Sequence, residues 1–295
     1  MRFKQTFSGL PSMVWPYLRV LSSSKPLLAE DGLLMPSLCV EARHVRINKA
    51  HLRRYQAICG LPIHDVLPHA YLHVLAMPLH MRVFIHPQFP VKVLGLVHLR
   101  NVIRHWKNID TSGVLRMAVD CNTLRETESG QEYDLVTRAY QGDQLVWEEI
   151  STMLARRLSS GKRPNIERAQ RNESSVIHEQ VITAQANTGR QYAFVSGDFN
   201  PIHLFDRTAQ AFHFKQTVAH GMWSLSRCIG LAESSFPGTA VELDAQFKLP
   251  IYLPGEFVFR SQCDQQDARR MDLTLTTLKG DRLHLVVRCR ALDQS

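Results

Sequence analysis

Two short segments in the second half of the chain hold the residues whose types and spacing could do chemistry. The first is Ser196-Gly197-Asp198-Phe199-Asn200-Pro201-Ile202-His203, which places a carboxylate and an imidazole five residues apart around an Asn-Pro pair. A residue before proline is held in an extended conformation, so the chain turns at Asn200. We therefore expect the side chains of Asp198 and His203 to point into one cavity, as general acid–base catalysis requires.

The second segment is Ala219-His220-Gly221-Met222-Trp223, which opens an apolar helical stretch. The N–H of Gly221 would lie in the first turn of that helix, where N–H groups have no partner within the helix and the helix dipole favours negative charge. A thioester carbonyl placed there would have its developing negative charge stabilised. This combination suits the addition of water to an α,β-unsaturated acyl thioester.

Both segments also have a simpler structural interpretation. Asp198 could form an Asx turn ahead of the Asn-Pro pair. His220 could be a polar residue at a helix start without a chemical role, and the sequence favours that interpretation over catalysis. The apolar residues that follow are expected in the core or in the wall of an acyl pocket: Met222, Trp223, Leu225 and Ile229.

The elements that must position these residues follow from hydrophobic patterning. In the second half, the pattern predicts a strand at 176–181, helices at 184–195, 208–214 and 221–233, and strands at 240–249, 256–263, 271–278 and 283–292. The helix at 221–233 is largely apolar and therefore buried. One buried helix wrapped by a curved antiparallel sheet, an α+β arrangement, satisfies this order.

The first half repeats the plan loosely. The pattern predicts a strand at 38–47, helices at 50–59 and 69–84, and strands near 94–105, 113–126, 132–141 and 144–157. Pro78 lies inside the second helix and predicts a kink or a break. The counterpart of the acid–base segment, Cys59-Gly60-Leu61-Pro62-Ile63-His64-Asp65, lacks the order of that segment, so we expect no complete active site in this half.

Domain boundaries follow from composition. Residues 159–175 are polar and lack apolar periodicity, which indicates a linker. We therefore expect an N-terminal extension at 1–35, a degenerate repeat at 36–158 and a catalytic domain at 176–295.

Overall composition limits the classes of function. Hydrophobic residues make up 44% and charged residues 21% of the 295 residues, an ordinary globular balance. No run of about 18 apolar residues and no signal-peptide core occurs, so we expect a cytoplasmic protein without a membrane span. The 6 cysteines are scattered, which predicts neither a zinc site nor a disulfide framework. The net charge of +8 is spread along the chain, so nucleic-acid binding is only weakly indicated.

The segment Tyr192–His203 resembles the hydratase-2 signature of the MaoC-like dehydratases, a family of (R)-specific enoyl-CoA hydratases with the hot-dog fold. Val218–Met222 resembles the segment that opens the central helix of that family, and Phe247–Pro250 with Pro254-Gly255 resembles its next strand and turn. The resemblance is specific over about residues 176–292. Over 36–157 it rests on the strand–helix plan and is similar to double hot-dog members with a degenerate first repeat. It implies an α+β double hot-dog fold, in which a curved antiparallel sheet wraps a long central helix in each repeat.

The resemblance also implies roles. Asp198 and His203 would form a catalytic dyad that activates water, Asn200 would orient it, and the amide of Gly221 would polarise the thioester carbonyl. The reaction would be the (R)-specific hydration of trans-2-enoyl thioesters in fatty acyl metabolism, or the reverse dehydration, by a hydro-lyase that needs no metal or other cofactor. Further residues would contact the substrate: Ser196, Gly197, Phe199, His220, Met222, Trp223, Ile229 and Lys248.

One position departs from the family. Its small bacterial members carry a serine eight residues after the glycine that matches Gly221, and here that position holds Ile229. The departure leaves the acyl chain open, and a hot-dog acyl-CoA thioesterase or a non-catalytic acyl-binding module remain alternatives. The expected partner is an acyl-CoA or acyl-carrier-protein thioester, with neither nucleic acid nor membrane. A monomer and a homodimer of double hot-dog units both fit.

Overall fold

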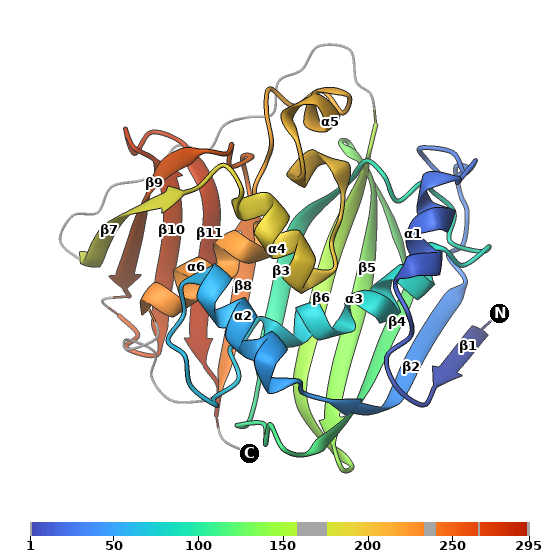
Figure 1. Ribbon diagram of the computed structural model, residues 1–295, viewed down its shortest axis with the longest axis horizontal. Helices are drawn as coiled ribbons and strands as arrows, with labels where there is room; N and C mark the ends of the chain where they lie inside the picture. Colours follow the sequence, from blue (N-terminus) through green and yellow to red (C-terminus); the bar gives the residue numbers. More distant parts are fainter. Residues whose placement is uncertain (1, 158–175, 233–239, 265, 294–295) are drawn as a thin grey trace. The chain divides into compact units, whose positions relative to one another are not determined.

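The chain forms two units, and each takes its residues from more than one stretch of sequence. The computed structural model is described for residues 2–157, 176–232, 240–264 and 266–293 (Figure 1). The first unit comprises residues 1–47, 72–101 and 109–163, and the second comprises 48–71, 102–108 and 164–295. The expected linker at 159–175 lies outside the described residues, and the domain boundaries stay a prediction.

The first unit is built on a sheet whose neighbouring strands are β1 (Arg2–Phe7), β2 (Ser37–Arg46), β4 (Val114–Thr127), β5 (Gly130–Gln141) and β6 (Gln144–Arg156), with β3 (Leu96–His105) next to β6. β1 pairs with β2 in parallel, whereas β2, β4, β5 and β6 pair antiparallel. The strands predicted for this half are confirmed. Two elements of the expected extension, β1 and α1 (Val14–Leu21), were not predicted.

The long helix of the first unit, α3 (Tyr71–Phe84), continues through Pro78. Of the expected kink or break, the break does not occur. Proline removes one hydrogen bond of the helix, but the side chains on several of its faces are buried, and this packing holds the turns on either side. The fully buried members include Leu72, Ala76, Leu79 and Val83.

A polar cluster lies between α3 and the strands of the first unit. Nδ1 of His73 lies 2.9 Å from Oε1 of Glu149, and the amide of Asn101 donates to the same carboxylate at 2.7 Å. Burial alone would raise the pKa of Glu149, but the neighbouring His73 outweighs it and lowers the pKa to about 2. The first unit thus encloses an ionised carboxylate in its core.

The second unit contains an antiparallel sheet and the helices that surround the acid–base segment. Its adjacent strands are, in order, β8 (Val241–Phe247), β11 (Leu283–Ala291), β10 (Arg270–Thr277), β9 (Gly255–Cys263) and β7 (Val176–Ala184). Helix α6 (Gly221–Ala232) packs on β10 and β11, and its apolar side chains form the core with those strands. Helix α2 (Lys49–Cys59) packs against both α4 (Thr188–Ser196) and α6 (Figure 1).

The predicted order of elements in the second half is confirmed, with one shifted boundary. The helix expected from residue 184 begins at Thr188, because Ala184 still pairs with Gly255 at the end of β7. The short helix expected at 208–214 is α5 (Asp206–Gln210).

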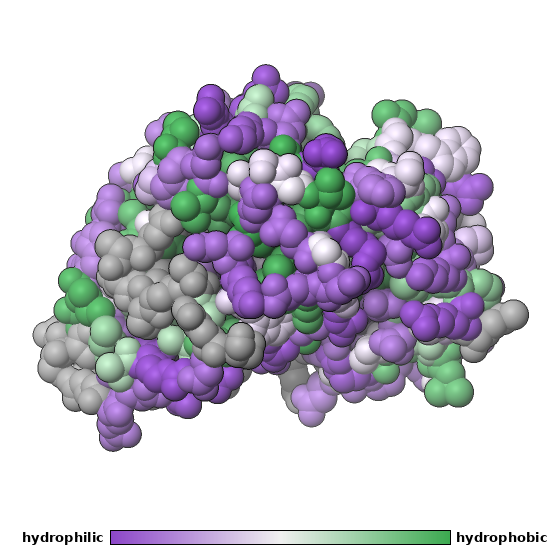
Figure 2. Space-filling view, turned by 90° about the horizontal axis from the view of Figure 1, so that it is seen from below, coloured by the Kyte–Doolittle hydropathy of each residue, from purple (hydrophilic) through white to green (hydrophobic). Residues whose placement is uncertain are grey.

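The displayed surface is mainly hydrophilic, and its hydrophobic side chains occur in small separate groups (Figure 2). Among the described residues, no helix combines the length and the hydropathy that a membrane span needs. Of the six free cysteines, only Cys263 is exposed.

Candidate active site

The acid–base segment forms a tight turn that its own sequence dictates. Gly197 ends α4 in the left-handed conformation at a φ of 72°, which glycine adopts without strain. The hydroxyl of Ser196 then accepts the N–H of Asp198 at 3.1 Å, and Oδ1 of Asp198 accepts the N–H of Asn200 at 3.1 Å. Asp198 is thus an Asx-turn former, as the simpler interpretation expected. Its second carboxylate oxygen, Oδ2, takes no part in that turn.

Asn200 starts the next element. Its side-chain oxygen accepts the N–H of Ile202 at 3.4 Å and caps the 3-10 helix η2 (Pro201–His203). Asn200 therefore shapes the backbone between the carboxylate and the imidazole.

His203 is buried and held in one orientation. Its Nδ1 lies 2.7 Å from the carbonyl oxygen of Val218. Because a carbonyl can only accept, Nδ1 carries the proton and Nε2 presents a lone pair. Burial lowers the pKa of His203 below its ordinary value, against the opposing charge of Asp198 and the bond to Val218. The imidazole is therefore a neutral base at neutral pH.

Gly189 allows α4 to touch the backbone of His203. A Cβ at this position would lie 2.2 Å from the carbonyl oxygen of His203. Glycine in the first turn of a helix costs stability relative to alanine. Its presence in the predicted helix therefore indicates that another part of the backbone approaches closely, which the sequence analysis did not recognise.

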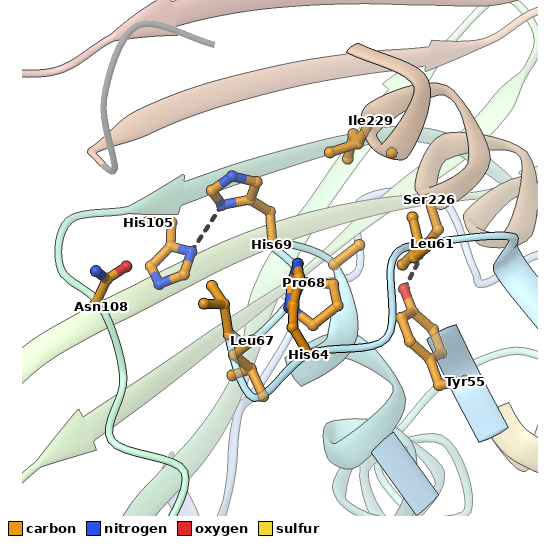
Figure 3. Close-up of a pocket in the computed structure, with 13 residues that line it drawn as sticks. Tyr55, Leu61, His64, Leu67, Pro68, His69, His105, Asn108, Ser226 and Ile229 are labelled. Carbon is orange, nitrogen blue, oxygen red and sulfur yellow. Dashed lines mark hydrogen bonds between the residues drawn. The ribbon is translucent and has the colours of Figure 1, made fainter. Parts of the chain in front are cut away.

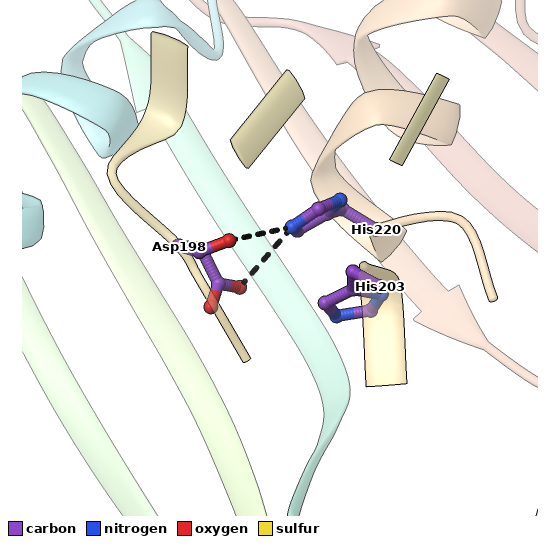
Figure 4. A group of neighbouring side chains, drawn as sticks. All are labelled: Asp198, His203 and His220. Carbon is purple, nitrogen blue, oxygen red and sulfur yellow. Dashed lines mark hydrogen bonds and ion pairs between the residues drawn. The ribbon is translucent and has the colours of Figure 1, made fainter. Parts of the chain in front are cut away.

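His220 completes a cluster with Asp198 and His203 (Figure 4). The two imidazole rings stack, with centroids 3.7 Å apart and planes inclined by 26°. Nε2 of His220 donates to the carbonyl oxygen of Asp198 at 2.9 Å and lies 3.8 Å from Oδ2. One ligand atom from each of the three side chains lies within 4.8 Å of the other two. The structure thus places His220 inside the site, where the sequence favoured a residue without a role.

Gly221 begins α6 directly after His220. A Cβ on Gly221 would lie 2.9 Å from Cε1 of Phe247, so the glycine lets the Phe247 ring pack against the helix start. The N–H of Gly221 belongs to the first turn, where no intrahelical carbonyl reaches it. This amide can therefore donate to a substrate oxygen.

The other residues expected at the substrate divide into two groups. In the first group, the residues that lie beside Asp198 are Ser196, Gly197 and His220. Phe199 packs edge-on against Phe194, with ring centroids 5.4 Å apart.

The second group comprises Met222, Trp223, Ile229 and Lys248. Met222 and Trp223 are buried, and the indole of Trp223 donates to the carbonyl oxygen of Ile58 in α2. Ile229 lines a separate cavity. Lys248 is exposed, and its backbone N–H donates to the carbonyl of His284. Their contact with the substrate stays a prediction.

The cluster has the spacing of a metal site as well as that of an acid–base site. A carboxylate and two imidazoles can bind a divalent transition metal. Nδ1 of His203 and Nε2 of His220 each face a backbone carbonyl oxygen. The expectation that no metal is needed stays a prediction.

Comparisons with known proteins identify related sequences. Residues 167–281 match the family described as MaoC like domain. The 3-hydroxyacyl-thioester dehydratase X of Mycobacterium tuberculosis is 27% identical over 286 residues, which cover 96% of this chain and 99% of that protein. The chain thus contains a MaoC-like domain over the matched residues. It is accordingly an enzyme of the hydratase and dehydratase class. The (R)-specific enoyl-CoA hydratase of Aeromonas caviae is 30% identical over 89 residues, 29% of this chain and 66% of that protein.

Solved structures establish the fold of this MaoC-like protein. A crystal structure of HtdX from Mycobacterium tuberculosis has a TM-score of 0.74 and 27% identity, and the match covers 86% of this chain and all of the other. A conserved hypothetical protein of the same organism, with a double hotdog fold, has a TM-score of 0.51 and 10% identity over 92% of this chain and 97% of its own. The expected double hot-dog fold is confirmed.

Proposed function

We propose that this MaoC-like enzyme hydrates trans-2-enoyl thioesters with (R) specificity and, in reverse, dehydrates (R)-3-hydroxyacyl thioesters. One observation carries the proposal: the side chains of Asp198, His203 and His220 converge directly before the first turn of α6. The named activities of the two relatives support the same class of substrate.

In this proposal, Asp198 and His203 hold one water molecule. The neutral His203 accepts its proton through Nε2 as the water oxygen bonds to the β-carbon of the enoyl group. The carboxylate of Asp198 stabilises the resulting imidazolium. The dyad then returns a proton to the α-carbon, so the elements of one water are added and no net proton is consumed. Because one dyad serves both carbons, both additions occur on the same face.

Gly221 stabilises the charge that develops on the substrate during the reaction. As water adds, negative charge moves onto the thioester oxygen. The N–H of Gly221 and the positive end of α6 stabilise that charge. Such a donor contributes about 100- to 1,000-fold in rate in other oxyanion sites.

His220 and Ser196 act as positioning residues in this scheme. His220 donates to the backbone carbonyl of Asp198, and Ser196 accepts the backbone N–H of the same residue. Both bonds fix the turn from which the Asp198 carboxylate projects. We further propose that the reaction needs no metal and that the acyl group arrives on coenzyme A or on a carrier protein.

The test is hydration of crotonyl-CoA, followed by the loss of enoyl-thioester absorbance and by chiral analysis of the 3-hydroxybutyryl product. We expect the (R) product, and we expect Asp198→Asn to abolish most of the turnover. Asp281→Asn makes the same change in an exposed turn of the same unit and should leave the rate unchanged. Release of free thiol without hydration would indicate a thioesterase instead. Tight acyl-CoA binding without turnover would indicate a binding module.

A further inference from the structure

Helix α2 comes from the first half of the sequence but belongs to the second unit, where it packs on the two helices that hold the proposed reaction centre. One is α4, whose end leads into the turn at Asp198, and the other is α6, which begins at Gly221. Hydrogen bonds join α2 to both helices, and they indicate a role for α2 in the reaction.

His51, in the first turn of α2, forms the bond to α4. Its Nε2 lies 2.8 Å from the carbonyl oxygen of Val195. This carbonyl is one of the last four of α4, which have no N–H partner within the helix. Val195 is buried, so its carbonyl oxygen would be costly to leave without a hydrogen bond. His51 therefore stabilises the end of α4.

A second bond fixes the ring of His51. Its Nδ1 lies 2.8 Å from the hydroxyl oxygen of Tyr71. The carbonyl of Val195 can only accept, so Nε2 carries the proton, and in the neutral ring Nδ1 is the acceptor for the Tyr71 hydroxyl. Burial raises the pKa of Tyr71, which keeps that donor protonated. Tyr71 thus favours the tautomer of His51 that can donate to Val195.

The first turn of α2 is itself held in place. The side-chain oxygen of Asn48 accepts the N–H of Ala50 at 2.9 Å and that of His51 at 3.1 Å. Such a cap satisfies two N–H groups that the helix cannot pair internally. The backbone of His51 is therefore as well fixed as its ring.

Two further bonds join α2 to α6. The indole of Trp223 donates to the carbonyl oxygen of Ile58 at 3.1 Å. The hydroxyl of Tyr55 lies 2.6 Å from Oγ of Ser226, and both residues line the cavity beside α6 (Figure 3). Helix α2 therefore connects the end of α4 to the helix that begins at Gly221.

The bond at Val195 lies directly before the turn that carries Asp198. The next residue, Ser196, accepts the N–H of Asp198 through its hydroxyl, and Gly197 makes the left-handed step between them. A displacement of the end of α4 would move this turn and the carboxylate with it. The side chain of Asp198 is 34% exposed, so the protein covers it only in part and its backbone must fix its position.

We propose that His51 is a positioning residue of the reaction. It fixes the end of α4, so that Asp198 stays aligned with His203 and with the amide of Gly221, and Tyr71 orients the His51 ring. This inference rests on the proposed function, because it requires Asp198 to take part in the reaction. It also makes α2, which lies outside residues 176–295, part of the support of the reaction centre.

The test measures kcat and KM for crotonyl-CoA in two variants of His51. His51→Leu removes the donor to Val195, and we expect it to lower kcat by about 10- to 100-fold, since a displacement of about 1 Å in a catalytic group can cost about 100-fold. The loss should fall on kcat more than on KM, because Asp198 acts in the reaction step. His51→Gln keeps side-chain N–H donors and should recover part of the rate.

Two other variants complete the comparison. Tyr71→Phe leaves the bond from His51 to Val195 possible and should lower kcat by less than His51→Leu does. His178→Leu is the matched control, because it changes another half-buried histidine of the second unit, one that packs edge-on against Phe259. It should keep the wild-type kcat. If His51→Leu fails to fold, a wild-type kcat in both His51→Gln and Tyr71→Phe still fits the proposal only if His51→Phe, folded, lowers kcat.

A double-mutant cycle distinguishes positioning from a general structural effect. If His51 acts through Asp198, adding His51→Leu to Asp198→Asn should change kcat by no more than about twofold, because the carboxylate that His51 positions is already gone. A purely structural role would lower kcat by the same factor in both backgrounds, and that result would overturn the proposal.

A measurement without substrate separates this inference from the proposed function. The backbone amide NMR signals of residues 196–203 should shift in His51→Leu and stay in place in His178→Leu. If wild-type enzyme hydrates crotonyl-CoA but folded His51→Leu keeps the wild-type kcat, the inference is wrong and the proposed function stands. If no enoyl-CoA is hydrated, the proposed function fails and the role of His51 in the reaction fails with it, whereas shifted amide signals would still show that His51 fixes the turn.

Discussion

Replacing Gly189 with alanine should displace His203 and thereby slow the reaction. The new Cβ would lie 2.2 Å from the carbonyl oxygen of His203 and 3.2 Å from its carbonyl carbon, whereas ordinary contacts begin at 3.4 Å. The neighbour is backbone and cannot rotate away, so α4 and η2 must separate by about 1 Å. A displacement of about 1 Å in a catalytic group can cost about 100-fold in rate. We expect kcat/KM for crotonyl-CoA to fall by about that factor.

Loss of stability must be distinguished from this loss of rate. The strained contact should lower the free energy of unfolding by about 1–3 kcal/mol, which leaves most of an ordinary domain folded. Unfolding by urea measures this quantity. Gly9→Ala is the matched control, because its Cβ would lie 3.6 Å from the carbonyl oxygen of His44, an ordinary contact with the same kind of atom. A folded Gly189→Ala enzyme with wild-type kcat/KM would refute the argument that this contact positions His203.

Four further perturbations probe the site and the core. Asp198→Asn and His203→Ala should each lower kcat by about 100- to 10,000-fold. Undiminished turnover of crotonyl-CoA in either variant would contradict the proposed catalytic dyad. Because the folded protein lowers the pKa of His203 from 6.5, kcat/KM should decline as pH falls with a midpoint below 6.5, as His203 gains a proton. A midpoint above 6.5 in the pH profile would contradict this assignment. Dialysis against EDTA should leave the rate unchanged, and a loss that one added metal restores would establish a metal site at the cluster. Glu149→Gln should lower the free energy of unfolding by about 3 kcal/mol, since it removes the partner of buried His73, whereas Glu128→Gln at an exposed position should be neutral in urea unfolding.

The parts of the site that the sequence predicts are those set by neighbouring residues. The turn from Gly197 to His203 depends on a left-handed glycine, an Asx turn and an Asn-Pro pair, and each acts over two or three residues. The strands are predictable for the same reason, because their alternation is local. Pro78 shows the limit of a local rule, since burial of the surrounding helix overrides its tendency to interrupt.

Contacts between distant residues were not predictable. The bond from His220 to Asp198 joins residues 22 apart, and only the fold stacks the ring of His220 on that of His203. Residues 59–65 are a second example. Their order indicates a degenerate copy of the acid–base segment, yet they lie in the second unit, where Leu61 and His64 line the cavity beside α6. A pattern comparison between the halves cannot reveal that role, because it depends on α2 packing against α6.

The packing of α2 against α6 determines what Ile229 means for the binding of an acyl chain. Where the family's small bacterial members carry a serine, this chain presents an apolar side chain, and the nearby hydroxyls of Tyr55 and Ser226 are already bonded to each other. An acyl chain along α6 therefore gains no new hydrogen bond from these three side chains. Because Gly221 and Ile229 belong to one rigid helix, the distance from the thioester carbonyl to the cavity is fixed. Selection should therefore depend on the length of the acyl chain.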